Sequence, residues 1–558
     1  MKIVRTATVV LLFTFFGVFL VLPLYTILLE GLQPIYLLEA VQNPVYVSGF
    51  INAFKIATVV TVLVAVVSIP MAMIAHRYDF PLRSWTNALV LLPLILPPFV
   101  GALGVQQLFE RTGAFNSLLT AIGLVAPGQG PDWLGQHRFA AVCLLEALHL
   151  YPILYLNVRT SLANIDPAMD EAARNLGASE WERLRTITLP LIRPGLFAGG
   201  VIVFIWSFTE LGTPLMLGYL DVTPAQIFAG IGELNSNPTA YSLVVVLLVV
   251  SSLLYFVGHY FLGRAQDLGS MKSSSGAKPA ELPHAWQRWG VTALFIGLSL
   301  LAIFPHFGVL LLSVSRDWHE TILPSAYTLR FYQDAVTHDF VVPSIGNSVL
   351  YASIATCGAV VLGLLVALVA VRWKPPGWRL LDGIAMLPLA VPGIILAFGY
   401  LSMATRYDWL RSWLDPIENP TLLLIIAYGT RRLPYVLRAA TAGLQQTPED
   451  LERAAANLGA KSFTVLSRIT VPLIFANLIG GMVFAFSFSM LEVSDSLILA
   501  QKMEYFPITR AIYELSMVLG SGPYIACAFG VWAMAFLGCS ILFATRMLGD
   551  RMGAMFRL

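Results

Sequence analysis

Apolar residues of this chain gather in long runs that short polar segments separate. Each run has about twenty residues or more, which is the length that a helix needs to cross the hydrocarbon core of a bilayer. The first six runs lie near 6–29, 48–75, 86–109, 138–160, 196–218 and 241–263, and six more lie near 289–314, 344–371, 380–404, 420–442, 476–500 and 524–546. The pattern therefore predicts an all-α polytopic membrane protein with about twelve transmembrane helices.

The composition favours a membrane protein and excludes a water-soluble globular one. Of the 558 residues, 57% are apolar and only 12% are charged, and the mean hydropathy is +0.75. A soluble protein has about a quarter of its residues charged, so this chain has too few polar side chains to cover a globule in water. The lipid bilayer is therefore its first expected partner. The net charge of +2 gives no indication of a nucleic-acid partner, and we expect none.

The two halves of the chain repeat each other. Matching residues recur at one offset, change to a second offset and then return to the first: Pro23/Pro305, Pro152/Pro434, Gly177/Gly459, Pro190/Pro472 and Glu210/Glu492 are 282 residues apart, whereas Asn52/Asn347, Arg77/Arg372, Pro93/Pro388 and Pro97/Pro392 are 295 apart. Each half has an even number of predicted spans, so we expect two parallel six-helix repeats, related by an axis along the membrane normal. The expected boundaries are a first lobe over 1–263, a polar linker over 264–288 and a second lobe over 289–558.

Lysine and arginine are unevenly distributed among the segments between the predicted spans. Lys2 and Arg5 precede the first span and four arginines lie in 165–195, whereas the segments 31–47 and 219–240 contain neither residue type. Short loops rich in lysine and arginine stay in the cytoplasm. This rule places the N-terminus, the linker and the segments near 165–195 and 446–475 in the cytoplasm, and the segments near 110–137, 315–343 and 405–419 outside.

The clearest motif lies in two of these cytoplasmic segments. Residues 171–177 read Glu-Ala-Ala-Arg-Asn-Leu-Gly, and residues 453–459 read Arg-Ala-Ala-Ala-Asn-Leu-Gly. Each copy is followed by Ile-Thr-x-Pro, at 187–190 and at 469–472. The pattern predicts a short helix of small residues, a glycine that permits a sharp turn, and a second helix that leads to a proline at the next span. Two such protrusions on one face suggest a two-fold partner that docks from the cytoplasm.

The pattern E-A-A-x-x-x-G followed by I-x-L-P resembles the coupling-helix motif of bacterial ABC importer permeases. Its doubling in one chain resembles the fused permeases of the ferric-iron importers, and the resemblance covers nearly the whole chain. It implies an inner-membrane permease with a cytoplasmic N-terminus that passes substrate from a periplasmic binding protein across the membrane by alternating access. It also implies two copies of a cytoplasmic ABC ATPase, in which ATP and Mg would bind. We expect neither catalysis nor a cofactor in this chain, whose sequence contains no G-x-x-x-x-G-K-[ST] phosphate loop.

In that family the motif helix sits in a groove of the ATPase and transmits closure of the ATPase dimer to the membrane helices. The residues that match the motif, and for which the resemblance implies ATPase coupling, are Glu171, Ala172, Ala173, Gly177, Ala454, Ala455 and Gly459. One position departs from the pattern, because Arg453 stands where the motif has Glu and Glu452 comes one residue earlier. Arg453 and Glu452 are both included among the coupling candidates. We expect that the two contacts with the ATPase can differ in strength.

Several ionisable residues fall within predicted spans, where charge is costly and is by default a sign of function. They are Glu210, Glu492, Asp495, His149, Arg431 and Arg432. In one interpretation they line the translocation path, and the acids lower the barrier for a cation while the arginines pair with them when the path is empty. In the other, the arginines and acids only lock spans together. His149 alone is also compatible with a satisfied interior histidine, and no metal site is assigned.

Prolines interrupt the third predicted span of each half, at Pro93 and Pro97 and again at Pro388 and Pro392. A proline removes a hydrogen bond from the helical ladder and bends the helix. These four residues are hinge candidates, and static bends are the equal alternative.

The substrate is the least determined property of the chain. The segments around Glu210 and Arg431 look most like those of ferric-iron permeases, so ferric iron is the expected substrate. Similar fused permeases are associated with thiamine, polyamine-like cations and aminoethylphosphonate, and these alternatives stay open. An alternative of another class is an ion-gradient-driven secondary transporter. Such carriers do not need paired Ala-Gly protrusions, and a co-purifying ATPase would distinguish the two classes.

Overall fold

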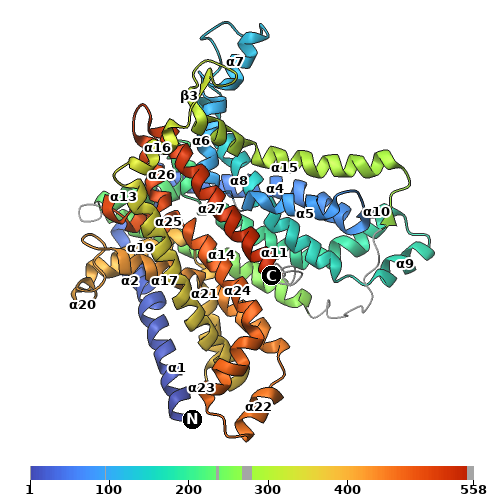
Figure 1. The fold of residues 1–558 in the computed structure, drawn as a ribbon, viewed down its shortest axis with the longest axis vertical. Helices are drawn as coiled ribbons and strands as arrows, with labels where there is room; N and C mark the ends of the chain where they lie inside the picture. The colour runs from blue at the N-terminus through green and yellow to red at the C-terminus, as the bar shows by residue number, and fades with distance from the viewer. Residues whose placement is uncertain (1, 95, 234–237, 267–279, 549–558) are drawn as a thin grey trace. The chain divides into compact units, whose positions relative to one another are not determined.

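The computed structural model describes residues 2–94, 96–233, 238–266 and 280–548. Almost all of its regular structure is helical, which confirms the predicted all-α class (Figure 1). The contacts divide the chain into two compact units. Unit 1 holds the described residues of 1–43, 227–248 and 332–556, and unit 2 holds those of 44–226 and 249–331.

The helices of unit 2 come mostly from the first half of the chain. They are α4 (Pro44–Arg77), α5 (Arg83–Leu91), η2 (Leu92–Leu94), α6 (Pro98–Phe109), α7 (Ala114–Ala121), α8 (Trp133–Ala163), α9 (Pro167–Asn175), α10 (Glu180–Arg183), η3 (Leu184–Thr188), α11 (Leu189–Phe208), α12 (Gly212–Met216) and α15 (Ala285–Val314). Two small β-ladders belong to the same unit: β1 (Tyr78–Asp79) pairs in parallel with β2 (Ala280–Glu281), and β3 (Ser315–Asp317) pairs antiparallel with β4 (Ala326–Tyr327).

Unit 1 combines the N-terminal helices with most of the second half. Its helices are α1 (Lys2–Phe16), η1 (Gly17–Val21), α2 (Leu22–Gly31), α3 (Pro34–Gln42), α17 (Val341–Leu368), η5 (Val369–Trp373), α18 (Trp378–Ala390), α19 (Gly393–Arg406), α20 (Asp408–Arg411), α21 (Thr421–Gln446), α22 (Asp450–Asn457), α23 (Ser462–Val465), η6 (Leu466–Thr470), α24 (Val471–Met490), α25 (Ser494–Leu499), η7 (Met503–Tyr505), α26 (Ile508–Met517) and α27 (Gly522–Leu548). Helices α13 (Thr223–Gly230), α14 (Thr239–Gln266) and α16 (Arg330–Thr337) run from one unit into the other, and η4 (Ile231–Glu233) follows α13.

Every predicted apolar run coincides with helical structure. Among the described residues, 9 helices are long and apolar enough to cross a membrane, and the count rises to 11 if two bent helix pairs are each one span. The bent pairs are the proline-interrupted third spans, and α18 and α19 meet at 106°. The remaining predicted run, 420–442, is α21, whose apolar sequence contains Arg431, Arg432 and Arg438. The prediction of about twelve membrane helices therefore agrees with the fold.

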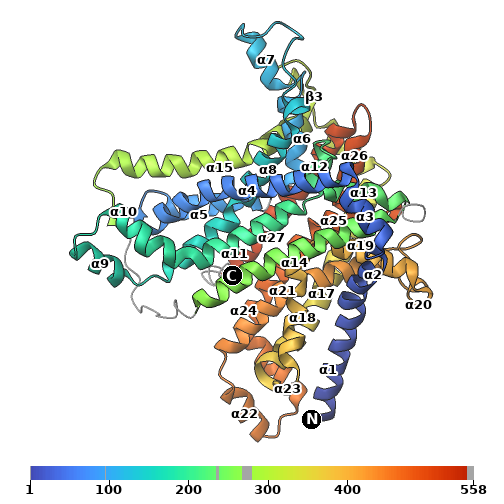
Figure 2. The ribbon, with the colours of Figure 1, turned by 180° about the vertical axis from the view of Figure 1, so that it is seen from behind.

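The repeat is visible in the packing within each unit. In unit 2 the helices α4, α8 and α11 pack against one another, and in unit 1 their counterparts α17, α21 and α24 do the same (Figures 1 and 2). Small residues allow helices to approach closely in a membrane. A Cβ atom placed on Gly481 of α24 would lie 2.9 Å from the Cβ atom of Ala439 on α21, and one on Gly443 would lie 2.9 Å from the Cβ atom of Ile474. Glycine at these positions is what lets α21 and α24 come together.

The compact units do not coincide with the two halves of the sequence. The first span of the first half packs in unit 1, where α2 contacts α19 and the hydroxyl of Tyr400 donates to the carbonyl of Phe19 at 2.7 Å. The first span of the second half is α15, which packs on α6 in unit 2. The lobe boundaries stay a prediction. They follow from the repeat in the sequence, whereas the two units are defined by contacts between residues, so the units do not test the boundaries. Most of the predicted linker, residues 267–279, lies outside the described residues.

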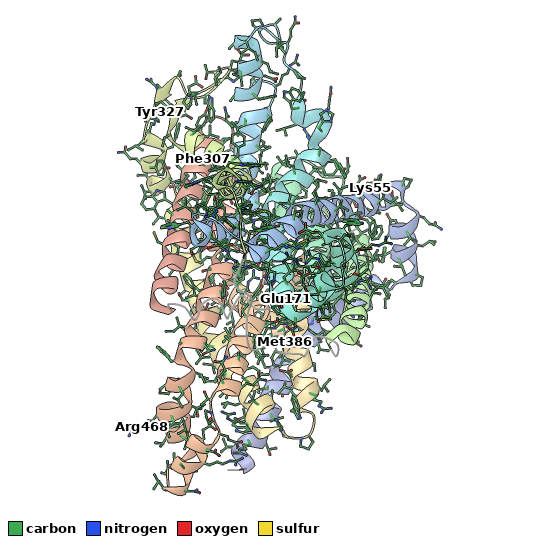
Figure 3. The ribbon with its side chains drawn as sticks, turned by 90° about the vertical axis from the view of Figure 1, so that its right-hand side faces the viewer. Lys55, Glu171, Phe307, Tyr327, Met386 and Arg468 are labelled. Carbon is green, nitrogen blue, oxygen red and sulfur yellow. The ribbon has the colours of Figure 1, made fainter. Side chains whose placement is uncertain are left out.

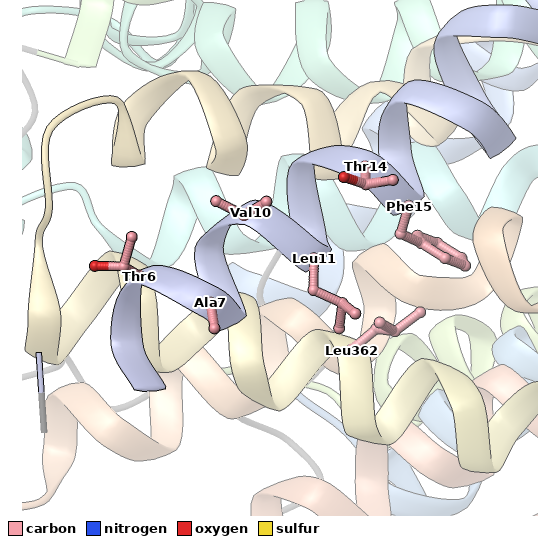
Figure 4. A pocket seen from close by; sticks show the side chains of 7 residues that line it. All are labelled: Thr6, Ala7, Val10, Leu11, Thr14, Phe15 and Leu362. Carbon is pink, nitrogen blue, oxygen red and sulfur yellow. The ribbon is translucent and has the colours of Figure 1, made fainter. Parts of the chain in front are cut away.

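One apolar groove lies along α1 in unit 1 (Figure 4). It has a volume of about 900 Å³ and is lined by Thr6, Ala7, Val10, Leu11, Thr14, Phe15 and Leu362. In a chain that spans a bilayer, such a surface is suited to contact with lipid acyl chains.

The close contact of α21 and α24 predicts which glycine tolerates a larger side chain. Gly481→Leu should separate the two helices and lower the melting temperature of the purified protein by several degrees, because overpacking costs about 1–3 kcal/mol. The control is Gly358→Leu in α17, where an added Cβ meets no atom within 4 Å. The explanation fails if both variants have the melting temperature of the parent protein.

Candidate functional site

The first of the two motifs forms a hairpin of two short helices in unit 2. The side chain of Asp166 accepts from the backbone N–H of Ala168 at 3.0 Å and caps the start of α9. Gly177 follows the helix with φ +85, a left-handed conformation that only glycine adopts without strain. Ser179 and Glu182 then form a capping box at the start of α10. The predicted helix–glycine–helix arrangement is present, and Figure 3 labels Glu171 on α9.

The second motif forms the same hairpin in unit 1. Helix α22 ends at Asn457, and Gly459 has φ +87. A short helix, α23, follows and continues through η6, on which Figure 3 labels Arg468. We call residues 167–188 the first hairpin and residues 450–470 the second hairpin.

Both hairpins present large apolar side chains to solvent at equivalent positions. Leu176 is 88% exposed, and Leu458, its counterpart 282 residues later, is 89% exposed. Two further exposed pairs are Met169 with Leu451 and Trp181 with Phe463. Exposed apolar clusters mark interaction surfaces. These residues are absent from the sequence-based candidates, although large apolar side chains at equal positions in both polar segments could have revealed them.

The motif residues differ in where they face. Glu171 and Ala172 are exposed on the first hairpin, as are Arg453 and Ala454 on the second, whereas Ala173 and Ala455 are half-buried. Arg453 contacts its own helix, with Glu449 at 3.0 Å and Asp450 at 3.9 Å. Glu452 faces inward and is bound by Arg372. By position Glu452 corresponds to Asp170, so it does not replace Glu171 on the outer face.

The structure brings four predicted path residues together in unit 1. Glu492 and Asp495 are buried where the chain leaves α24 and begins α25. Glu492 forms ion pairs with Arg431 and Arg432 of α21, and Arg431 lies 3.5 Å from Asp495. Arg432 also lies over the ring of Phe488 at 5.5 Å. Both interpretations pair the arginines with these acids, so the ion pairs do not decide between them and the role in the translocation path stays a prediction.

The first half has the same helix break with a different set of charges. Glu210 lies between α11 and α12, and its Oε1 accepts from the backbone N–H of Thr213 at 3.3 Å. A second acid, Glu146 of α8, is buried and accepts from the hydroxyl of Ser207. Glu146 is absent from the sequence-based candidates because its counterpart is Tyr428, so comparison of the halves shows no acid there. The signal available was a carboxyl group inside an apolar span.

His149 is placed at the bend of the third span. Its Nδ1 donates to the carbonyl of Pro93 at 2.7 Å. In a regular helix that carbonyl would accept from the residue four positions later, but Pro97 has no N–H group. The histidine therefore satisfies a carbonyl that the proline pair leaves open. Its counterpart Arg431 lies against Gly393, directly after the bend between α18 and α19.

The four prolines lie at or next to these bends. Pro93 is in η2 and Pro97 precedes α6, while Pro388 lies inside α18 and Pro392 precedes α19. Their role as hinges stays a prediction. In the part of the chain that the structure describes, no group of three or more His, Cys, Asp or Glu side chains could hold a metal ion.

Comparison with known proteins assigns the family. The model of the binding-protein-dependent transport system inner membrane component matches twice, over residues 68–267 and 359–551. This chain belongs to that family. The double match confirms a fused, two-lobed permease, and the family places it as a multi-pass component of the inner membrane.

Relatives of the permease include proteins of different substrate classes. It is 27% identical to the ferric transport system permease protein FbpB of Actinobacillus pleuropneumoniae over 92% of this chain and 72% of the relative. It is 28% identical to a putative ferric transport system permease protein of Haemophilus influenzae over 82% of this chain and 70% of the relative. The sulfate transport system permease protein CysT of Escherichia coli is 29% identical over 39% of this chain and 77% of the relative. These relatives are permease subunits rather than enzymes.

The charge cluster of the second half predicts a stability effect that a partner change should reverse. Glu492→Gln leaves two buried guanidinium groups without their main carboxylate, and breaking one side of a buried pair costs about 3–5 kcal/mol. The variant should melt several degrees below the parent permease. Adding Arg431→Gln and Arg432→Gln should recover part of the loss, and a triple variant that melts no higher than Glu492→Gln would contradict this.

Proposed function

We propose that this permease is the membrane subunit of an ATP-driven importer for ferric iron. The observation that carries the proposal is the extent of the match: relatives named as ferric permeases align with 92% and 82% of the chain, in the same fused form. The sulfate permease aligns with 39% of it and a molybdenum permease with 35%. Membership of a binding-protein-dependent family also removes the alternative of an ion-gradient-driven carrier.

The carboxyl groups at the helix breaks suit a hard cation. Glu210 and Glu492 lie where spans are discontinuous, and broken helices of transporters commonly form substrate sites. Oxygen ligands favour hard metal ions. In the proposal, each of these acids attracts the cation at its own helix break, and Arg431 and Arg432 neutralise Glu492 and Asp495 while no cation is present.

The two hairpins are the proposed docking sites for two copies of an ABC ATPase, which bind and hydrolyse ATP outside this chain. Support comes from the paired exposed leucines, Leu176 and Leu458, and from the motif residues beside them. This arrangement requires the N-terminus and both hairpins to be cytoplasmic, as the distribution of lysine and arginine predicts.

The proposed periplasmic face is built from the loops predicted to lie outside. In unit 2, two of these loops are joined, because the N–H of Glu320 donates to the carbonyl of Thr112 at 3.1 Å, and Gln107 near the end of α6 donates to the carbonyl of Trp318 at 2.6 Å. In unit 1, the backbone N–H of Glu418 helps to hold the pKa of Asp415 below its usual range. Such ordered loops suit the docking of a substrate-binding protein.

An oxyanion importer is the second candidate. It is favoured by the matches to sulfate and molybdenum permeases over single halves of the chain and by the adjacent arginines of α21. The pairing of both arginines with Glu492 argues against it, since an anion would have to displace a buried carboxylate.

Uptake into proteoliposomes tests the proposal. With the cognate ATPase and binding protein, the permease should accumulate radioactive ferric iron in an ATP-dependent manner, and should accumulate neither sulfate nor molybdate. Glu210→Gln with Glu492→Gln should reduce uptake per assembled complex at least tenfold at a temperature where the variant stays folded, because two charges are lost from a low-dielectric region. An assembled double variant that transports iron normally would refute the path assignment, and sulfate uptake would support the second candidate.

The fused chain also predicts the composition of the complex. One copy of the permease should bind two ATPase subunits, since both hairpins are present in one chain. Native mass spectrometry of the purified complex measures this ratio. Two permease chains for each pair of ATPase subunits would contradict the proposal.

A further inference from the structure

The two hairpins are anchored in different ways, although they occupy equivalent positions in the repeat. From this difference we propose that the second hairpin is latched directly to the cytoplasmic end of α17, whereas the first hairpin is held by its own residues and can tilt against α4. The latch itself is a property of the permease alone. Its consequence for transport rests on the proposed docking of an ATPase.

The latch of the second hairpin is a buried ion pair. Both carboxylate oxygens of Glu452 accept from Nε of Arg372, at 3.1 and 3.2 Å, and Arg372 also donates to the carbonyl of Thr447 at 2.9 Å. The hydroxyl of Thr470 donates to Glu452 at 3.2 Å. The side chains of Arg372 and Glu452 are only 9% and 16% exposed. One carboxylate therefore joins η5, which continues α17, to both ends of the hairpin.

The first hairpin has the same acid position but a different partner. Asp170, the counterpart of Glu452, accepts from Nη1 of Arg183 at 2.6 Å. Arg183 belongs to α10, inside the hairpin, and its counterpart in the second hairpin is Val465. The pair therefore closes the first hairpin on itself and does not tie it to a span.

The counterpart of Arg372 is Arg77, at the end of α4, and it makes a weaker link. It reaches Glu180 at 3.3 Å, and the two side chains are 41% and 74% exposed. Exposed pairs of this kind are screened by water and contribute little, whereas a buried pair resists separation because each charge would be left uncompensated. A displacement of α22 is therefore transmitted to α17 as a rigid-body movement, and a displacement of α9 is only loosely transmitted to α4.

Hydrogen exchange of the purified permease in lipid nanodiscs tests the latch without ATPase or substrate. Arg372→Gln should accelerate amide exchange of residues 450–470 at least tenfold, and the matched variant Arg77→Gln should change exchange of residues 167–188 by less than twofold. The charge reversal Arg372→Glu with Glu452→Arg should restore protection. If the Gln variant folds poorly, Arg372→Lys, which keeps the positive charge, should retain part of the protection. Equal effects of the two Gln variants, or no effect of either, would overturn the proposal.

Transport coupling gives a readout that a purely structural role would not change. In the complex with its cognate ATPase, Arg372→Gln should lower the amount of iron moved per ATP hydrolysed at least threefold while ATPase binding is retained, and Arg77→Gln should leave that ratio within twofold of the parent. Equal losses in both variants would contradict the asymmetric latch. If the parent moves no iron, the proposed substrate fails, and the exchange experiment still decides on the latch.

Discussion

Polar groups inside a bilayer must find their partners within the protein, and the architecture of this permease depends on that constraint. Water is absent from the hydrocarbon core, so an unsatisfied carbonyl or an unpaired charge there costs several kcal/mol. Long helices satisfy most of the backbone. The exceptions lie at the proline bends and at the breaks near Glu210 and Glu492, and it is at these points that histidine, arginine and carboxyl side chains enter the spans.

The two halves meet this constraint with different chemistry on the same backbone. In the first half, His149 donates to the carbonyl of Pro93, to which Pro97 has no N–H to donate. Glu146 accepts from the hydroxyl of Ser207, three residues before Glu210. In the second half, Arg431 takes the place of the histidine and pairs with Glu492 and Asp495. Duplication thus preserved the bends and breaks while the charges diverged. The hairpins show the same divergence, since the equivalent acids Asp170 and Glu452 pair with different arginines, Arg183 and Arg372. A fused chain permits this, because each half can specialise without a change in the other.

Much of the fold could be read from the sequence, because hydrocarbon imposes a simple pattern. The apolar runs predicted the helices, the offsets of 282 and 295 predicted the repeat, and Gly177 and Gly459 predicted the two hairpins. The packing of the first spans could not be predicted, since all apolar helices expose similar surfaces to lipid and only contacts such as that of α2 with α19 decide between partners. Glu146 was missed because its counterpart is Tyr428. The inward turn of Glu452 depends on Arg372, which is distant in sequence and becomes its neighbour only in the folded unit.

Water access to the break between α24 and α25 tests most directly whether this break lies on the proposed translocation path. The test uses a variant in which three cysteines are replaced, namely Cys143, Cys527 and Cys539. Ser494→Cys is introduced at the half-buried start of α25. Cys357 is kept as a control, because it is exposed on the apolar surface of α17. A membrane-impermeant thiol reagent would be applied from each side of the membrane, with and without trapped ATP. If the break lies on the path, Ser494→Cys should react from opposite sides in the two nucleotide states while Cys357 reacts in neither. A cysteine at 494 that stays unreactive from both sides in both states would contradict it.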